Sequence, residues 1–248
     1  MDTRALIIGD DPPPGGPAED VALGPALLAR GLGDATEMVR IHRPEPTAAF
    51  SRRDTNQTGY DRAADAAREF GFTAVVRPQG GRLAAYHRGS VVIDHVLREA
   101  NPQAGLKQRF EHYAALHARV LRGFGLDARI GELAGEYCPG EHSINASGLT
   151  KIVGSAQRVT RDGWLFSSVI QVTDSQSIRE MLTKAYAEIG YELDPTTIGS
   201  MDDHVPGVRA EAVAEELRRE YVANLGAVPA GLPAQILREV ASSSAAMH

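Results

Sequence analysis

Four strand patterns follow one another between residues 128 and 172 of this 248-residue chain, and no helical pattern separates them. They cover residues 128–130, 143–146, 151–158 and 164–172. Each is a short apolar or alternating run that ends at a turn signal. Antiparallel neighbours can be joined by short turns, whereas parallel neighbours need a long crossover. This stretch therefore predicts antiparallel strands, and no other feature of the sequence restricts the fold as much.

Helical and further strand patterns surround this stretch. Helices are predicted at residues 20–30, 60–70, 106–124, 177–189 and 209–224, and strands at residues 38–41, 48–50, 72–77 and 90–96. The two kinds of element mix without regular alternation, and neither a repeat nor a linker divides the chain. We therefore expect an α+β fold with a flexible lead-in at residues 1–17, one domain at residues 18–225 and a tail at residues 226–248.

Charge and composition exclude several classes of function. The net charge of −6 argues against a protein that binds nucleic acid or an anionic membrane surface. No apolar run approaches the roughly 20 residues that cross a bilayer, and no leader pattern is seen, so we expect a cytoplasmic protein. A single cysteine excludes an internal disulfide and a cysteine-based zinc site, and no other cluster of metal ligands stands out.

The only cysteine, Cys138, is followed directly by Pro139 and Gly140. This dipeptide predicts a bend, and N–H groups exposed at a bend can stabilise a thiolate and an oxyanion. Cys138 is therefore a candidate nucleophile. His142, four positions further on, is the candidate base that would accept its proton. The alternatives are a buried structural cysteine and a histidine on the surface.

Lys151 follows thirteen positions after Cys138 and is one of only three lysines in the chain. It opens a predicted strand, and Gly148 and Gly154 on either side would leave room for a ligand against the backbone. Its ammonium could hold an acyl carbonyl or a phosphate. The alternative is an exposed lysine at the edge of a strand.

The Gly80-Gly81 pair lies between two predicted strands. It could cradle a carboxylate, a phosphate or an acyl group, or it could be the plain turn of a hairpin. Arg77 before the pair and His87 after it make a polar cluster at this loop a further candidate.

Two segments carry a resemblance to a known family. The first reads Arg77-Pro-Gln-Gly80-Gly81-Arg-Leu-Ala-Ala-Tyr86-His87, and the second reads Gly148-x-x-Lys151-Ile152-x-Gly154-x-Ala156-Gln157-Arg158. They are similar to the Arg-x-x-Gly-Gly-Gly…His loop and the Gly-x-Lys-x-x-Gly-x-Ala-Gln signature of the lipoate–protein ligase and octanoyltransferase superfamily (biotin/lipoate A/B protein ligase). The resemblance covers about residues 20–200.

The resemblance implies a mixed, largely antiparallel sheet flanked by helices, of the class II aminoacyl-tRNA synthetase and biotin–protein ligase type. It also implies an apolar tunnel for the acyl chain. Tyr137-Cys138-Pro139-Gly140 resembles the branch that moves octanoyl or lipoyl groups between carrier proteins through a cysteine thioester. That branch implies an acyltransferase that uses Cys138 as nucleophile, with Lys151 holding the acyl carbonyl and stabilising the oxyanion.

Substrates and partners follow from the same resemblance. The implied substrate-binding residues are Arg77, Gly80, Gly81, Tyr86, His87, Gly148, Gly154 and Ala156. The octanoyl or lipoyl group is a substrate, and no permanently bound cofactor and no metal are expected. The implied partners are lipoyl-domain carriers of the glycine cleavage H-protein or 2-oxoacid dehydrogenase E2 type, with acyl carrier protein as a further candidate.

Two departures from the family pattern keep alternatives open. Arg82 replaces the third glycine of the ligase loop, and Arg88 stands where an acidic residue often follows the histidine. Both favour a transferase over an ATP-dependent lipoate–protein ligase, which would bind ATP and Mg²⁺ and leave Cys138 a bystander. A third alternative is a catalytically degenerate homologue that still binds lipoyl domains.

Overall fold

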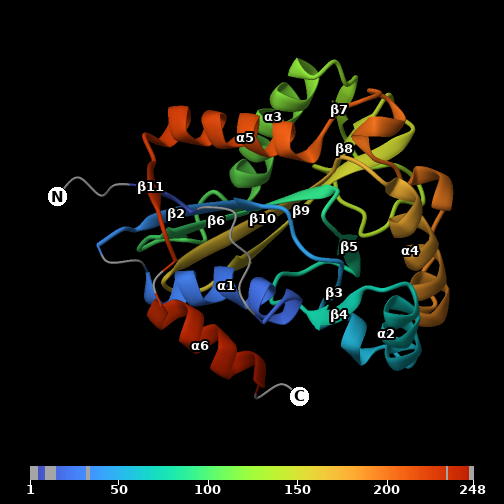
Figure 1. Ribbon diagram of the computed structural model, residues 1–248, viewed down its shortest axis with the longest axis horizontal. Coiled ribbons are helices and arrows are strands. Elements are labelled where there is room, and N and C mark those ends of the chain that lie inside the picture. The colour runs from blue at the N-terminus through green and yellow to red at the C-terminus, as the bar shows by residue number, and fades with distance from the viewer. Residues whose placement is uncertain (1–4, 9–14, 32–33, 233, 246–248) are drawn as a thin grey trace.

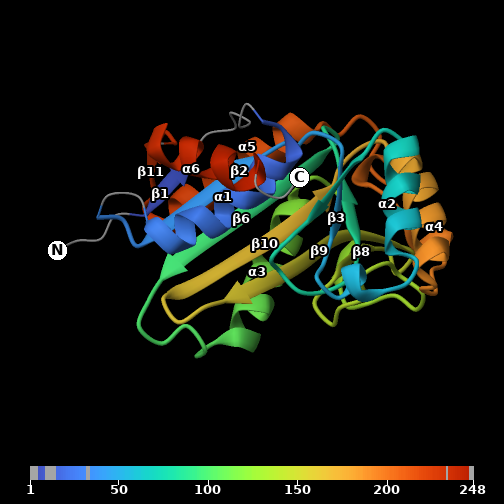
Figure 2. The same cartoon turned by 90° about the horizontal axis from the view of Figure 1, so that it is seen from below.

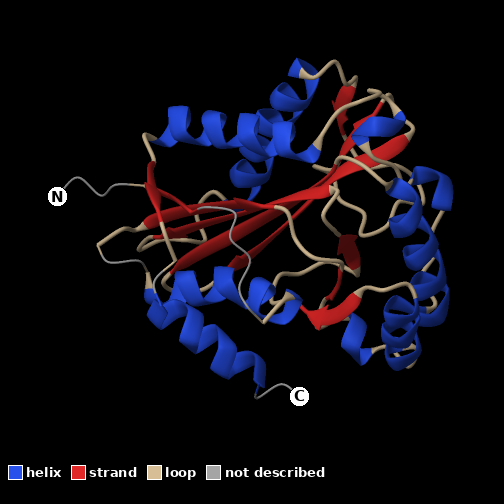
Figure 3. Cartoon of the chain, in the orientation of Figure 1, coloured by secondary structure: helices blue, strands red, loops and turns tan. Residues whose placement is uncertain are grey.

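The computed structural model describes residues 5–8, 15–31, 34–232 and 234–245. Helices cover both faces of a long twisted sheet, and a small second sheet lies beyond one end of it (Figures 1 and 3). This is the predicted α+β architecture, with a mixed and mostly antiparallel large sheet.

The large sheet has eight strands in the order β11-β1-β2-β6-β10-β9-β8-β7. Their bounds are β1 Leu6–Ile8, β2 Glu37–His42, β6 Ser90–Arg98, β7 Ala128–Ile130, β8 Ile144–Ala146, β9 Thr150–Val159, β10 Gly163–Gln171 and β11 Val228–Ala230. From β2 to β7 every neighbouring pair is antiparallel. The antiparallel pairing predicted for residues 128–172 is therefore confirmed, and short turns join β8 to β9 and β9 to β10.

The small sheet has the order β4-β3-β5, with β3 at Thr47–Phe50, β4 at Thr73–Val76 and β5 at Ala84–Tyr86. Strand β3 lies between the other two, parallel to β4 and antiparallel to β5. The segment with Gly80 and Gly81 is consequently a loop, and the hairpin alternative is wrong. Because β6 belongs to the large sheet, residues 87–89 cross from the small sheet to the large one.

The predicted lead-in and tail differ from the structure. Strand β1 pairs in parallel with both β2 and β11, and Ile7 and Ile8 are buried. Helix α6, Ala234–Ala245, follows β11 and packs on α1, Pro17–Arg30. Burial of the apolar strand and this helix pairing tie both segments to the fold. Lead-in residues 1–4 and 9–14 lie outside the described residues, and Pro17 already belongs to α1.

Three pairs of helices build the cores. Helices α1 and α6 cover one face of the large sheet, and α3 (Leu106–Gly123) and α5 (Ala210–Leu225) cover the other (Figures 1 and 2). Helices α2 (Tyr60–Glu69) and α4 (Ser175–Ile189) pack against the small sheet. Short 3₁₀ helices occur at Asp54–Asn56, Pro195–Thr197 and Met201–Asp203. Each sheet has its own main core, and a smaller buried cluster joins Ala49 and Tyr86 of the small sheet to Val92 of the large one. A cavity opens where the two sheets meet.

Within the described part of the chain, no helix combines the length and the apolar character that a membrane span requires.

Candidate active site

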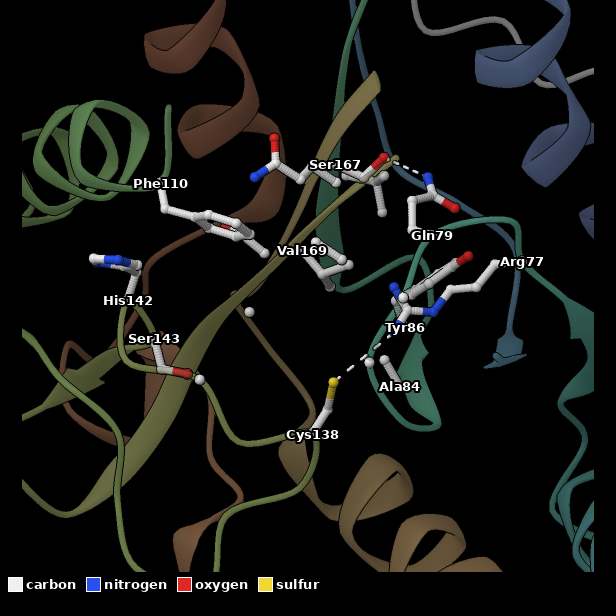
Figure 4. Close-up of a pocket in the computed structure, with 18 of the residues that line it drawn as sticks. Arg77, Gln79, Ala84, Tyr86, Phe110, Cys138, His142, Ser143, Ser167 and Val169 are labelled. Carbon is white, nitrogen blue, oxygen red and sulfur yellow. Dashed lines mark hydrogen bonds between the residues drawn. The ribbon is translucent and has the colours of Figure 1, made fainter. Parts of the chain in front are cut away.

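A cavity of about 620 Å³ lies between the large sheet and the loops that lead to and from the small one (Figure 4). Its middle is apolar, with Ala84, Val92 and Val169 on its walls. Its size is typical of sites for small organic ligands. The loop between β7 and β8, residues 131–143, and the loop between β4 and β5 form part of its lining.

Cys138 reaches this cavity from the β7–β8 loop and is neither fully buried nor fully exposed. Its sulfur accepts the backbone N–H of Arg82 at 3.2 Å and lies 3.9 Å from Nη2 of Arg77. Its own N–H donates to the hydroxyl of Tyr186 at 2.8 Å, which in turn donates to the carbonyl of Leu83 at 2.8 Å. The sulfur thus has an N–H group and a guanidinium beside it, and both can donate to negative charge that develops in a reaction there.

The backbone of Cys138 is strained, because its φ of 41° lies in the left-handed region that non-glycine residues rarely adopt. Such a conformation persists only where the surrounding contacts hold it. The alternative of a buried structural cysteine does not describe Cys138, which is only partly buried: it packs against the core of the small sheet and also lines the cavity.

Gly81 lies directly against the sulfur. Its φ is 98°, and a Cβ there would be 2.8 Å from Sγ of Cys138 and 3.0 Å from Nη2 of Arg77. Gly80 has no neighbour within 4 Å of a hypothetical Cβ, so space does not require glycine there. Only Gly81 is thus needed for the close approach of the loop to Cys138.

Arg82, which replaces the third glycine of the family loop, turns its side chain away from the sulfur. The guanidinium lies 4.7 Å from the ring centroid of Tyr191. Only the backbone N–H faces Cys138, and any residue but proline can supply it. A large side chain at this position is therefore compatible with the site.

Lys151 is buried, with 1% of its side chain exposed, so the alternative of an exposed edge lysine is wrong. Its ammonium donates to Oε1 of Glu136 at 2.8 Å and to the carbonyls of Tyr137 and Cys138 at 3.0 and 2.9 Å. These bonds use all three N–H groups of the ammonium. A direct contact of Lys151 with an acyl oxygen would require one of them to be exchanged.

Glu136 was not predicted from the sequence, where nothing separates it from other glutamates. Its side chain is completely buried. Besides Lys151, its carboxylate accepts the hydroxyl of Ser143 at 2.6 Å and the backbone N–H groups of Leu133 and Gly140 at 2.9 and 3.2 Å. Four donors on one carboxylate make Glu136 the centre of the β7–β8 loop.

His142 lines the cavity but lies apart from Cys138. Its ring stacks on Phe110 with centroids 5.6 Å apart, and Figure 4 shows both on the far side of the cavity from the sulfur. No hydrogen bond joins His142 to Cys138, and both of these residues belong to the described part of the chain. The role of His142 as base stays a prediction that this geometry does not support.

The remaining predicted residues divide into two groups. Arg77, Gly80, Gly81, Tyr86, Gly154 and Ala156 line the cavity. His87 lies outside it, because Nε2 is 3.1 Å from the carbonyl of Asp174 and Nδ1 accepts the N–H of Gly89 at 2.8 Å. Gly148 is in the turn between β8 and β9, where its N–H donates to Oδ1 of Asn145. The motif therefore contains structural as well as cavity residues.

Polar groups gather at another end of the cavity. Gln79 donates to Ser167, which donates to Asp94 (Figure 4 draws the first of these bonds). Nearby, Asp20 pairs with Arg40 at 2.6 Å and with His42 at 3.1 Å. Burial alone would raise the pKa of Asp20, but the charges and hydrogen bonds of His42 and Arg40 hold that pKa well below its usual value.

The described residues contain no group of three or more histidine, cysteine, aspartate or glutamate side chains arranged to hold a metal ion. What the cavity offers instead is one sulfur, a guanidinium beside it and an apolar wall. Such a set can perform nucleophilic acyl transfer.

Comparison with known sequences identifies relatives of the chain. The family model of the lipoyl protein ligase A/B catalytic domain matches residues 17–222. An octanoyl-[GcvH]:protein N-octanoyltransferase of Geobacillus kaustophilus is 30% identical over 193 residues, which are 77% of this chain and 68% of the relative. An enzyme of the same name from Kyrpidia tusciae is 28% identical over 156 residues, 62% of this chain and 52% of the relative.

Solved structures have the same fold. A Thermoplasma acidophilum protein with bound lipoic acid has a TM-score of 0.73 at 19% identity, and the match covers 98% of this chain and 95% of the other. Lipoate-protein ligase A bound with ATP has a TM-score of 0.71 at 20% identity, with 98% and 94% covered. At these identities the likeness concerns the fold.

Proposed function

The chain belongs to the lipoyl protein ligase A/B catalytic domain family, and from that premise we propose that it is an octanoyltransferase acting through a thioester on Cys138. The octanoyltransferase relatives support the reaction. One observation carries the proposed mechanism: the only sulfur nucleophile of the chain faces an apolar cavity, with the N–H of Arg82 and the guanidinium of Arg77 beside it.

The first step is transfer to the enzyme. The thiolate of Cys138 attacks the carbonyl carbon of an octanoyl group that is amide-linked to a lysine of a donor carrier. The Sγ–C bond forms, the C–N bond breaks, and the released lysine amine takes up one proton. The negative charge that develops on the carbonyl oxygen is stabilised by donors already fixed around the sulfur.

The second step returns the group to a carrier. The amine of the acceptor lysine attacks the thioester carbonyl, the Sγ–C bond breaks, and the new amide nitrogen loses one proton. Protons and charge balance over the two steps, so neither ATP nor a permanently bound cofactor is needed. Splitting the reaction also allows two bulky carriers to use one site in turn.

Arg77 supplies the positive charge of this mechanism. Its guanidinium is near the sulfur, and its Nε is buried without a hydrogen-bond partner in the described structure. Arginine remains charged throughout the physiological pH range. Arg77 can therefore stabilise the thiolate and the oxyanion without a proton transfer of its own, which suits a site where His142 does not contact the nucleophile.

The acyl chain fits the apolar part of the cavity, against Ala84, Val92 and Val169. The proposed donor is an octanoylated carrier of the H-protein kind, in line with the names of the relatives. The proposed acceptor is the lysine of a lipoyl domain of the 2-oxoacid dehydrogenase E2 kind. Acyl carrier protein is the alternative donor, with a thioester in place of the amide.

Intact-protein mass spectrometry tests this function. After incubation with octanoylated H-protein, the wild type should gain the mass of one octanoyl group on Cys138, and a lipoyl domain added later should remove it. The Cys138→Ala variant should gain nothing and transfer nothing. Full activity of that variant, with pyrophosphate released from ATP, would establish the ligase alternative instead.

A further inference from the structure

Glu136 stands two positions before Cys138 and is enclosed by its own loop. Its Oε2 accepts the N–H of Leu133, on one side of the bend, and its Oε1 accepts Gly140 and Ser143, on the other side. The carboxylate thus closes the loop around the cysteine. Because such a buried charge is costly unless it is paired, its position also determines where a cation must lie.

That cation is Lys151 of β9, whose ammonium lies 2.8 Å from the carboxylate. The other two N–H groups of the ammonium hold the carbonyls of Tyr137 and Cys138. Lys151 therefore connects Glu136 to the peptide groups on both sides of the Cys138 Cα. Its charge is neutralised within the loop.

The conformation of Cys138 depends on these contacts. A cysteine with a φ of 41° has no intrinsic preference for that state, so its neighbours must impose it. Lys151 holds its carbonyl and Tyr186 holds its N–H. With both peptide groups fixed, the side chain points at the N–H of Arg82, where the sulfur is found.

We propose that Glu136 is a positioning residue for octanoyl transfer, and that Lys151 acts with it as a clamp on the Cys138 backbone. This inference rests on the proposed function. Glu136 orients the ammonium, the ammonium holds the two carbonyls, and the carbonyls aim the sulfur. The charge that stabilises the reacting atoms comes from Arg77 and the N–H of Arg82.

The test compares two glutamates of the same loop. Glu136→Gln keeps the shape of the side chain but removes its charge, and Glu132→Gln changes an exposed side chain that does not line the cavity. Single-turnover octanoylation of Cys138 is measured at several concentrations of octanoylated H-protein. Displacement of a nucleophile by about 1 Å can cost about 100-fold in rate.

We expect Glu136→Gln to lower the maximal acylation rate by about 10- to 100-fold, with the half-saturating carrier concentration changed by less than about twofold. Glu132→Gln should behave as the wild type. A merely destabilising change would reduce the folded fraction, which thermal unfolding detects, and would leave the rate of the folded molecules unchanged. A wild-type rate in folded Glu136→Gln would overturn the proposal.

A double variant separates a clamp from an independent catalytic lysine. If the two residues act as one unit, Lys151→Met and Glu136→Gln combined should be no slower than Lys151→Met alone. If the rate reductions of the two single variants multiply in the double variant, Lys151 contributes separately and the clamp is overturned.

Each single variant leaves one buried charge without its partner and thereby destabilises the fold. The combination Glu136→Leu with Lys151→Met removes both charges together. A folded, slow double variant supports the proposal, and a folded double variant with the wild-type rate contradicts it. Absence of octanoylation in the wild type would contradict the proposed function itself, which keeps the two failures distinguishable.

Discussion

Arg77 and Cys138 meet across the cavity wall, with Nη2 of the arginine 3.9 Å from the sulfur. The same nitrogen donates to the carbonyl of Arg82 at 2.9 Å, and the N–H of Arg82 donates to the sulfur. One arginine therefore fixes the backbone that contacts the nucleophile and also brings a positive charge to it. The loop between β4 and β5 has an electrostatic part in the site as well as a steric one.

Replacing Arg77 should affect the chemical step. Arg77→Met is expected to lower the rate of Cys138 octanoylation about 100-fold, or roughly 3 kcal/mol, the usual effect of removing one oxyanion donor. Arg68→Met, at an exposed position on α2, is the control. The measurement is single-turnover acylation followed by mass spectrometry. Equal rates in the two variants would remove Arg77 from the mechanism.

The two glycines of the loop should respond differently to one methyl group. Gly81→Ala introduces a Cβ 2.8 Å from Sγ at a φ of 98°, so the loop or the sulfur must move. The left-handed conformation alone costs an alanine about 1–2 kcal/mol. We expect acylation to slow by at least about tenfold.

Gly80→Ala is the matched control, since its Cβ meets no atom within 4 Å. Its acylation rate should stay within about twofold of the wild type. If both alanine variants react alike, the contact between Gly81 and the sulfur does not matter for the reaction.

His142 offers a test of the sequence-based prediction of a histidine base. Because its ring stacks on Phe110 and does not contact Cys138, His142→Phe should keep the stack and lower the acylation rate by less than about threefold. A general base normally contributes about 100-fold or more. A loss of that size, together with a changed pH–rate profile, would restore the role of His142 as base.

The stability of the fold should depend on pH through a buried histidine. Burial, followed by the charges of His112 and His95, lowers the pKa of His117 to about 3. The unfolded chain binds a proton near pH 6.5, so stability is fully present above that value and is lost as the pH falls toward 3. The slope approaches about 1.4 kcal/mol per pH unit, which gives about 2 kcal/mol between pH 6.5 and pH 5.

Urea unfolding at pH 7 and pH 5 measures this dependence. His117→Gln should lower the difference in the free energy of unfolding between pH 7 and pH 5, because glutamine does not titrate. The pKa values of His95 and Asp20 are also lowered, so both residues contribute further loss of stability as the pH falls. The contribution of Asp20 begins only in more acidic solution, near the ordinary pKa of a carboxyl group. An unchanged difference in the variant would mean that His117 is not the group responsible.

The order of strands was predictable where the connections are short. Strands β8, β9 and β10 follow one another through short turns and pair with their chain neighbours, so turn signals and apolar runs were sufficient. Strands β1 and β11 have three residues each, too few for a periodic signal, and pair with each other across most of the chain. No local pattern could have predicted that pairing. For this reason a flexible lead-in and a tail were predicted where the structure has paired strands.

The site shows the same division. Cys138, Lys151 and Gly81 could be identified because residue type and neighbours mark them. Glu136 and Tyr186 could not, since each acts through backbone groups that only the folded loop brings within reach. His87 shows the converse, a motif residue whose ring is held by the carbonyl of Asp174 and the N–H of Gly89, away from the cavity.

The β7–β8 loop has a consequence for how such proteins diversify. It carries the sulfur, and it leaves and re-enters the sheet at one antiparallel pair, where Ile130 of β7 lies opposite Ile144 of β8. Exchange of this one loop can therefore add or remove the nucleophile, while the strands that form the opposite cavity wall keep their places. Grafting residues 131–143 into a relative without this cysteine would test whether that loop alone is sufficient for octanoylation of the cysteine.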